Sequence, residues 1–313
     1  MKKKLLVISL LTTIFVGNLL SQQNIVLTHF VFDKMSINPG ATGIGMRDGF
    51  CGTTVYRNQW DRVNGAPNSA LLNVEGNLSR YFNGGFGLSF YHDAIGFSRQ
   101  NNVVLTYSYH LPLGNGILGI GASAGLVSYG MQPDWVTPQP GLNDPNLPIG
   151  VTEANLDANF GVYYMSYDGW YAGVSATHLP AMRLEQLNFE TARHYYAMGG
   201  YRQKEMFGIN ELDFDYNVLV RTELVKFSAD FNARAIYNFN PTINGWGGLT
   251  YRIDDAVGIM AGIEYNNFAI GYSYDFTVNA LSNISWGSHE ILLRYCHFLP
   301  PVPITRSRNP RYL

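Results

Sequence analysis

The stretch Phe268-Ala269-Ile270-Gly271-Tyr272-Ser273-Tyr274-Asp275-Phe276 indicates the fold most clearly, because two kinds of residue alternate along it. Every second residue, starting at Phe268, is aromatic or isoleucine, and the residues between them are small or polar. Side chains of a β-strand point alternately to opposite faces, so this pattern predicts a strand with one apolar and one polar face.

Further segments of the chain repeat this alternation. The clearest run over residues 102–111, 211–220, 227–238 and 257–265. A soluble sandwich also alternates, but its strands are usually five or six residues long, whereas a strand that crosses an outer membrane needs about ten. The length of these segments, and the ionisable groups on their polar face, favour membrane strands.

Fourteen such segments can be counted, which predicts an all-β fold: a closed antiparallel transmembrane β-barrel. Closure leaves no unpaired strand edge in lipid, and an even number of strands is typical of single-chain barrels. The segments are predicted to start near Phe50, Asn68, Gly84, Asn102, Gly116, Asn155, Gly169, Arg193, Glu211, Lys226, Thr242, Ala256, Phe268 and Ser288.

The composition agrees with a barrel and excludes other classes of protein. The chain has 33 Gly, 21 Tyr and 18 Phe, and only 14% of its residues are charged. A net charge of −2 gives nucleic-acid binding no electrostatic support. Two cysteines are too few for a disulfide framework.

The amino-terminal residues have the pattern of an export signal. Three lysines at positions 2–4 precede an apolar run from Leu5 to about Val16, and Ser21 is a small residue at a plausible cleavage point. A transmembrane anchor is the rival interpretation, but the run is shorter than the roughly 20 residues that a spanning helix needs. The predicted parts are therefore a signal peptide (1–21), a short amino-terminal periplasmic or plug segment (22–49), the barrel (50–298) and a Pro-rich tail (299–313).

The lengths of the connections predict how the barrel is oriented. With both termini in the periplasm, the long connections 57–67, 130–154, 178–192 and 277–287 all lie outside. The tight connections 112–115, 168–169, 240–241 and 266–267 all lie in the periplasm. Long external loops and short periplasmic turns are typical of outer-membrane barrels.

Several motifs of the mature chain resemble, in order and spacing, the PorP/SprF family of type IX secretion proteins. The amino-terminal ones are His29-Phe30-Val31-Phe32-Asp33, Asn38-Pro39-Gly40-Ala41-Thr42-Gly43, Tyr56-Arg57-Asn58-Gln59-Trp60 and Gly65-Ala66-Pro67. The later ones are Asn101 to His110, Asn143-Asp144-Pro145-Asn146-Leu147-Pro148, Arg193-His194-Tyr195-Tyr196, Gly271 to Phe276 and Gly287-Ser288-His289-Glu290-Ile291. The chain departs from the shorter pattern of many barrels by continuing past Phe298 into Leu299-Pro300-Pro301-Val302-Pro303 and a basic tail.

The resemblance implies a function without catalysis. It implies an outer-membrane component of the secretion and gliding machinery that binds or anchors a secreted partner with a C-terminal sorting domain. It also implies contacts with the periplasmic ring or with a peptidoglycan-linked lipoprotein. The candidate partner-binding residues lie after the first strand, in the long loop and in the tail: Arg57, Trp60, Trp135, Asp144, Pro145, Leu147, Pro148, Arg306, Arg308 and Arg311.

Each of these candidates has a structural alternative. Arg57 and Trp60 could belong to an aromatic girdle with a network of hydrogen bonds in the adjacent loop, and the tail could be disordered. The Pro residues of 132–149 favour an ordered but irregular loop, and long loops on rigid scaffolds commonly carry binding sites. An extended Pro-rich tail suits docking onto another protein.

Charged residues on the polar face predict ion pairs inside the barrel rather than a selective pore, because buried charges must be paired. They are Glu211, Asp213, Asp215, Arg221, Asp230, Arg234, Glu264, Asp275, Glu290 and Arg294. The histidines His110, His194 and His289 lie on distant strands and predict no metal site. No cofactor is expected.

An enzyme and a transporter are the two other classes to consider. A Gly-x-Ser-x-Gly motif is absent, and Ser288 and His289 are neighbours on one strand, so they point to opposite faces and cannot form a catalytic pair. A FadL-like transporter or a porin for small hydrophobic solutes is the better rival. It would use the amino-terminal segment as a plug beside a lateral opening or an apolar pocket.

The two cysteines give a test of barrel closure. Cys51 lies near the start of the first predicted strand and Cys296 near the end of the last, and these strands are antiparallel neighbours in a closed barrel. Both are expected to face the lumen, and the sequence therefore predicts that they lie close together. A bond between them is chemically permitted in the oxidising periplasm but depends on the register.

Overall fold

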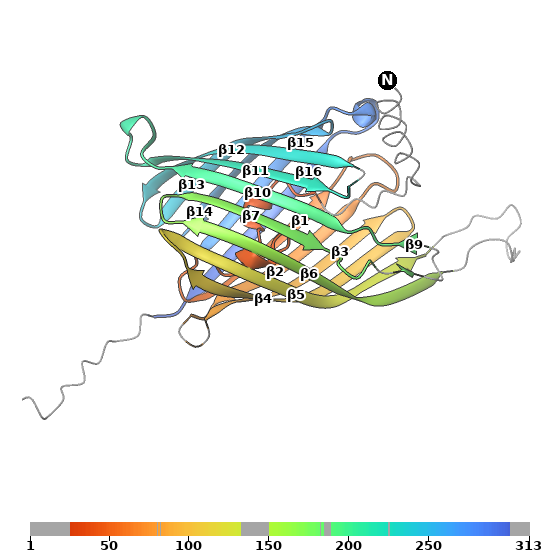
Figure 1. Ribbon diagram of the computed structural model, residues 1–313. Helices are drawn as coiled ribbons and strands as arrows, with labels where there is room; N and C mark the ends of the chain where they lie inside the picture. The colour runs from red at the N-terminus through yellow and green to blue at the C-terminus, as the bar shows by residue number, and fades with distance from the viewer. Residues whose placement is uncertain are drawn as a thin grey trace, which may run out of the picture.

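The computed structural model is a closed antiparallel barrel of fourteen strands, as the alternation predicts (Figure 1). It describes residues 26–79, 81, 83–132, 150–181, 183–184, 189–224 and 226–300. Each strand pairs with the barrel strands before and after it in the chain, and β1 closes the barrel on β16. The strands β8 and β9 form a separate two-stranded sheet.

The barrel strands are β1 Gly49–Asn58, β2 Asn68–Asn77, β3 Gly84–Ile95, β4 Ser98–Pro112, β5 Gly116–Met131, β6 Val151–Ser166, β7 Trp170–Thr177, β10 His194–Gln203, β11 Leu212–Thr222, β12 Phe227–Asn240, β13 Ile243–Arg252, β14 Ala256–Tyr265, β15 Phe268–Thr277 and β16 Ser288–Phe298. The small sheet consists of β8 Arg183–Leu184 and β9 Phe189–Glu190. The described residues also form four short 3-10 turns: η2 Phe30–Phe32, η3 Pro39–Ala41, η4 Met206–Gly208 and η5 Ala280–Asn283. None of the helices in the described residues is long and apolar enough to span a membrane.

The predicted strand starts agree with the structure to within one residue, except at β4 and β6. Both begin four residues earlier than predicted, at Ser98 and Val151. The register explains the difference, because Met131, the last residue of β5, is paired with both Ser98 and Val151. The extra residues belong to the strands because they pair with the long strand β5. Residues 98–101 are all polar, so no alternation predicts a strand there.

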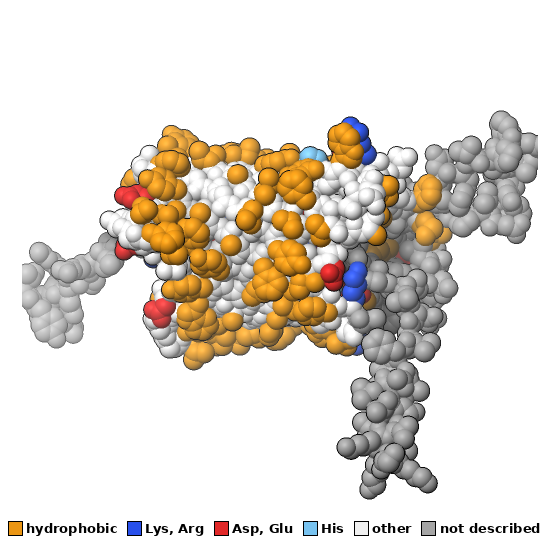
Figure 2. Space-filling view, turned by 90° about the horizontal axis from the view of Figure 1, so that it is seen from above, with side chains coloured by type: hydrophobic (Ala, Val, Ile, Leu, Met, Phe, Trp, Pro, Cys, Tyr) orange, Lys and Arg blue, Asp and Glu red, His pale blue; other side chains and the backbone are white. Residues whose placement is uncertain are grey.

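The outer surface of the barrel is apolar and its interior is polar. Exposed side chains such as Leu105 (65%) and Leu156 (71%) lie on the outer face, where apolar side chains form a broad belt (Figure 2). On β4 the buried residues between the exposed aromatics are Thr106, Ser108 and His110. Apolar-out and polar-in alternation is the arrangement of a lipid-embedded barrel.

The two ends of the barrel carry different connections. Residues 59–67, 132–150, 178–193 and 278–287 connect strands at one end, which we call the loop end. At the other, the turn end, most connections are short, and residues 241–242 and 266–267 are examples. The connection at residues 204–211 is the longest at the turn end.

The amino-terminal segment lies inside the barrel and crosses it from end to end (Figure 1). Val26 lies at the loop end, beside Trp60, Asp254 and Leu281, and β1 begins at Gly49 at the turn end. We call residues 26–48 the plug. Because β16 ends at the turn end, the two ends of the described chain lie at opposite ends of the barrel. Both termini lie outside the described residues, so the prediction that they share one side stays a prediction; Val26 itself lies at the end of the barrel opposite the start of β1.

The cysteine prediction is confirmed. Cys51 and Cys296 are paired in register between β1 and β16, and they form a disulfide with a Cα–Cα distance of 4.0 Å. Both side chains are buried at the turn end of the lumen. The bond therefore links the first and last strands at the seam where the barrel closes.

Candidate functional site

The apolar side chains of the plug form the core of the barrel. The path of the plug through the lumen is the feature that could least be predicted from the sequence. Phe30, Val31 and Ala41 pack against wall residues of β6, β7, β10 and β11, which are Tyr163, Tyr171, Tyr196, Met198 and Leu219. On the opposite wall, Leu27 lies in a second cluster with Leu71, Ile236, Trp246 and Leu292. Phe32 packs against both clusters. The plug therefore joins the two sides of the lumen, which the strands alone would leave apart.

A buried network of charges fixes the plug near the loop end. Glu290 accepts hydrogen bonds from the backbone N–H groups of Thr28 (2.9 Å) and His29 (2.7 Å), and its Oε1 lies 2.6 Å from Nδ1 of His29. Arg57 donates to Glu290 (3.1 Å) and to Asp275 (2.8 Å), and the hydroxyl of Thr28 also donates to Asp275 (2.8 Å). All five residues are at most 2% exposed. Charges buried this deeply require such partners, so Arg57 and the two carboxylates hold each other and the plug.

The network continues across three more strands at the same end. Arg252 contacts Asp275 (3.5 Å), Asp230 (3.1 Å) and Asp255 (3.1 Å), and Arg221 pairs with Asp230. These residues come from β11, β12, β13, the connection after β13, and β15. The loop end of the lumen is therefore crossed by a continuous chain of ion pairs.

Asn38, which begins the Asn-Pro motif, binds the wall through its side-chain amide. Its Nδ2 donates to the backbone oxygens of Val162 on β6 (3.0 Å) and Val174 on β7 (3.2 Å). Its Oδ1 accepts from the N–H of Gly40 and caps η3, in which Pro39 is the first residue. Proline is favoured at that position because its missing N–H would have no partner there.

Glycines on the wall allow η3 to approach the strands closely. A Cβ atom at Gly121 would lie 2.2 Å from the carbonyl carbon of Pro39, and one at Gly161 would lie 2.1 Å from Oδ1 of Asn38. A Cβ at Gly40 itself would lie 2.8 Å from the oxygen of Gly119. Any side chain at these positions would push the plug away from β5 and β6.

Polar side chains of the wall fasten the remaining length of the plug. Ser108 donates to the oxygen of Gly40 (2.9 Å), His110 contacts the oxygen of Thr42 (3.0 Å), Ser175 donates to the oxygen of Ile37 (2.6 Å), and Glu75 accepts from the N–H of Gly43 (3.0 Å). The backbone polar groups of a buried irregular segment need partners, and the wall supplies them.

Two adjacent charged residues lie in the middle of the plug. Burial raises the pKa of Asp33 to about 7, although Asn73 and the N–H of Ser36 donate to its carboxylate. Burial lowers the pKa of Lys34 to about 8, and its ammonium lies 3.6 Å from the centroid of the Tyr171 ring. Both residues therefore titrate closer to neutral pH than exposed side chains of their type.

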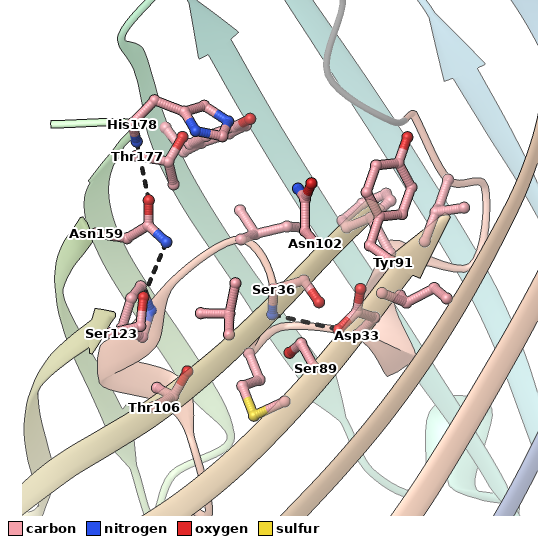
Figure 3. Close-up of a pocket in the computed structure, with 18 of the residues that line it drawn as sticks. Asp33, Ser36, Ser89, Tyr91, Asn102, Thr106, Ser123, Asn159, Thr177 and His178 are labelled. Carbon is pink, nitrogen blue, oxygen red and sulfur yellow. Dashed lines mark hydrogen bonds between the residues drawn. The ribbon is translucent and has the colours of Figure 1, made fainter. Parts of the chain in front are cut away.

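A cavity of about 100 Å³ remains beside the plug in the loop-end half of the lumen (Figure 3). Side chains of the plug, such as Asp33 and Ser36, face hydroxyl and amide side chains of the wall across it (Figure 3). Among these, Asn159 accepts from the N–H of His178 (2.9 Å) and donates to Ser123 (2.9 Å). The cavity has the size for several water molecules and polar partners for them, and apolar side chains such as Leu27, Leu71 and Leu219 complete its lining.

A second pocket, of about 290 Å³, opens at the loop end, and we call it the mouth pocket. Its wall combines apolar side chains, including Trp60, Ile253 and Leu281, with the charged residues Lys226 and Asp254. Val26, where the described chain begins, lines it directly.

The predicted partner-binding residues fall into two groups. Trp60 lies at the loop end, half-buried beside the mouth pocket, whereas Arg57 is 2% exposed and faces the plug. Arg57 therefore presents no surface to a partner, which corrects the contact predicted for it. Trp135, Asp144, Pro145, Leu147, Pro148, Arg306, Arg308 and Arg311 lie outside the described residues.

The predicted ion pairs inside the barrel are confirmed for most of the charged residues. Arg221 pairs with Asp230, Arg234 with Asp215, and Arg57 with Asp275 and Glu290. Arg294 instead donates to the sulfur of Cys51 (3.7 Å).

The histidines occupy separate environments. His110 binds the plug, His194 pairs with Glu223 (2.8 Å), and His289 lies 2.7 Å from the hydroxyl of Tyr272. In the described part of the chain, no three or more His, Cys, Asp or Glu side chains are arranged to hold a metal ion.

Thr28 and His29 could not be predicted from alternation, because alternation identifies strands and these residues precede the first one. One signal was available. Arg57, Asp275 and Glu290 all lie on the polar face of their predicted strands, and the polar residues Thr28 and His29 immediately precede the aromatic segment that starts at Phe30.

Comparison with known proteins gives a family match over most of the chain. The family described as type IX secretion system membrane protein PorP/SprF matches residues 19–295. Among curated proteins, none matches.

Solved structures with a similar fold are outer-membrane barrels. The toluene transporter TbuX of Ralstonia pickettii has a TM-score of 0.54 at 12% identity, over 85% of this chain and 93% of that one. The toluene transporter TodX of P. putida has a TM-score of 0.48 at 8% identity, over 82% and 91% of the two chains. CdiB of Acinetobacter baumannii has a TM-score of 0.46 at 11% identity, over 80% and 60%. At these identities the likeness concerns the fold alone.

Proposed function

The chain belongs to the PorP/SprF family of type IX secretion system membrane proteins, and we propose that it anchors a secreted partner at the cell surface. The partner would carry a C-terminal sorting domain, as gliding adhesins of these systems do. The protein is an outer-membrane component of type IX secretion, and its family and fold are not those of a known enzyme class.

The observation that carries the proposal is the closed lumen. The plug crosses the whole barrel and is held by apolar packing, by the buried network around Arg57 and by the glycine contacts of η3. A barrel filled in this way is a rigid support rather than a conduit. Its loop end carries the long connections, and long loops on a rigid scaffold commonly carry binding sites. Since external loops are the long ones in outer-membrane barrels, the loop end would face outward.

Transport of a small solute is the second candidate, and the cavity beside the plug is the observation that favours it. The cavity is lined by apolar and polar side chains, but its volume of about 100 Å³ is small beside the roughly 300–1,000 Å³ of pockets that bind small molecules. Uptake of an apolar solute by liposomes that contain the wild-type protein would favour the transporter over the anchor.

Deleting residues 133–149, within the connection between β5 and β6, is expected to leave the barrel folded and to abolish retention of the secreted partner. The connection starts at the end of β5, the strand to which both neighbours pair along its full length, so the barrel does not depend on it. Surface display of the partner on intact cells measures the effect, and heat-modifiable migration reports the fold. A partner displayed at wild-type level by the folded variant would exclude this loop from the binding surface.

The tail is proposed to meet a periplasmic component, either the secretion ring or a peptidoglycan-linked lipoprotein. Arg306, Arg308 and Arg311 give it a positive charge, and β16 delivers the chain to the turn end. Truncation after Phe298 is expected to remove the cross-links to periplasmic partners and to leave the heat-modifiable migration unchanged. Cross-links that all persist in the truncated protein would assign these contacts to the barrel instead.

A further inference from the structure

The direction in which the plug runs has a consequence for the amino terminus. Thr28 and His29 bind Glu290 at the start of β16, and Gly43 binds Glu75 near the end of β2. β16 starts at the loop end and β2 ends at the turn end. The plug therefore passes from the loop end to the turn end before the first strand begins.

The segment that precedes the plug is short. With cleavage after Ser21, as the sequence predicts, residues 22–25 are the only ones before Val26. Four residues span at most about 14 Å. Ten-residue strands such as β1, tilted as in a barrel, cross roughly 25 Å. The four residues are therefore too short for the amino terminus to reach back to the turn end, and the plug already fills the lumen through which they would have to pass.

The mouth pocket is the space that lies next to this segment. Val26 lines it, and the residue before it, Ile25, continues an apolar run that ends in the buried Leu27. Trp60, Ile253 and Leu281 give the pocket an apolar wall against which Ile25 can pack. A pocket of about 290 Å³ is large enough for a side chain and its backbone but not for a folded domain.

We propose that the mature amino terminus lies at the loop end, on the external face of the outer membrane, with Ile25 seated in the mouth pocket. The free amino terminus and the amide side chains of Gln22, Gln23 and Asn24 then form part of the surface that a partner meets. The turn end, which faces the periplasm, carries only the carboxyl terminus. The proposal rests on the path of the plug and holds whether or not the protein anchors a secreted partner.

Single cysteines can test the position of the amino terminus, because the two native cysteines are bonded to each other. We would introduce Asn24→Cys, Asn64→Cys in the connection after β1 and Asn210→Cys in the connection after β10, and treat intact cells with a membrane-impermeant maleimide. Asn64 and Asn210 are exposed at the loop end and the turn end, respectively. We expect Asn24→Cys and Asn64→Cys to be labelled on intact cells, and Asn210→Cys to be labelled only after permeabilisation.

Labelling of Asn24→Cys in the same pattern as Asn210→Cys would overturn the proposal. Should Asn24→Cys be shielded under both conditions, an epitope inserted between Gln22 and Gln23 gives the same information, and antibody binding only after permeabilisation would overturn it. Mass spectrometry of the mature protein verifies that the chain starts at Gln22.

A pair of substitutions tests whether Ile25 packs in the mouth pocket. Leu281→Asp places a charge in the pocket wall and is expected to increase the labelling rate of Asn24→Cys. Leu224→Asp changes a residue that is 79% exposed at the same end but does not line the pocket, so the rate is expected to stay the same. Equal rates in both backgrounds would place Ile25 outside the pocket.

Discussion

Replacing Arg57 with alanine is expected to lower the free energy of unfolding by about 3–5 kcal/mol, because removing one partner of a buried ion pair leaves uncompensated charge behind. Arg57 is 2% exposed and contacts both Asp275 and Glu290. Without it, the two carboxylates repel each other in a closed environment. Glu290 is also the acceptor for the N–H groups of Thr28 and His29, so the plug loses the geometry that holds its loop-end part.

The effect has two measurable parts. The temperature at which the folded band is lost in heat-modifiable electrophoresis should fall, and a protease site placed in the plug should become accessible in the detergent-solubilised protein. Arg57→Lys keeps the charge but replaces the two guanidinium nitrogens, which bind Glu290 and Asp275 separately, with a single ammonium nitrogen, so an intermediate loss is expected. Arg99→Ala is the matched control, because Arg99 is half-buried at the loop end and its side chain binds only the backbone oxygens of Gly96 and Ser98. Wild-type stability of the Arg57→Ala variant would mean that the network does not hold the plug.

The strands could be predicted from the sequence because their signal is local. Each strand shows its faces in its own alternation, and the faces of Cys51 and Cys296 followed from parity counted along two strands. The disulfide confirmed that count and the closure together. Where a strand is held by a neighbour instead of by its own pattern, as at residues 98–101, the predicted strand begins four residues too late.

The site could be predicted only in part, because its contacts join residues far apart in the chain. Parity placed Asp275 and Glu290 on the lumen face but not beside Thr28 and His29, which are more than 240 residues away. The same limit explains the error about Arg57. Its position at the end of the first strand is compatible with a surface contact and with a buried ion pair, and only the path of the plug decides between them.

The path of the plug also explains why the Asn-Pro motif stands where it does. Asn38 donates to two carbonyl oxygens, one on β6 and one on β7, and a Cβ atom at Gly40 would meet backbone atoms of three wall residues. The Asn-Pro motif is therefore a contact between the plug and the wall. This role depends on glycines at positions 119, 121 and 161, none of which carries a local signal for it.

Removing the plug is expected to convert a closed barrel into an open channel. A barrel of eight strands is filled by its own side chains and one of sixteen encloses an aqueous channel, so fourteen strands without a plug should leave a water-filled passage. We expect no steady conductance from the wild-type protein in planar bilayers. A variant in which residues 24–42 are deleted, so that Gln23 is joined to Gly43, should conduct ions in steps of constant size.

A single substitution tests the same closure without shortening the chain. Gly121→Leu places a side chain where even a Cβ atom would lie 2.2 Å from Pro39, so it should displace the plug and produce intermittent openings. Gly247→Leu is the matched control, since Gly247 is exposed on the outer face of β13 and a Cβ there has its nearest neighbour at 3.8 Å. If neither substitution nor the deletion produces conductance, and the deletion variant migrates as a folded barrel, then the strands and their ion pairs close the lumen by themselves. In that case the plug would serve to position the amino terminus, and closure of the lumen would no longer argue for an anchor.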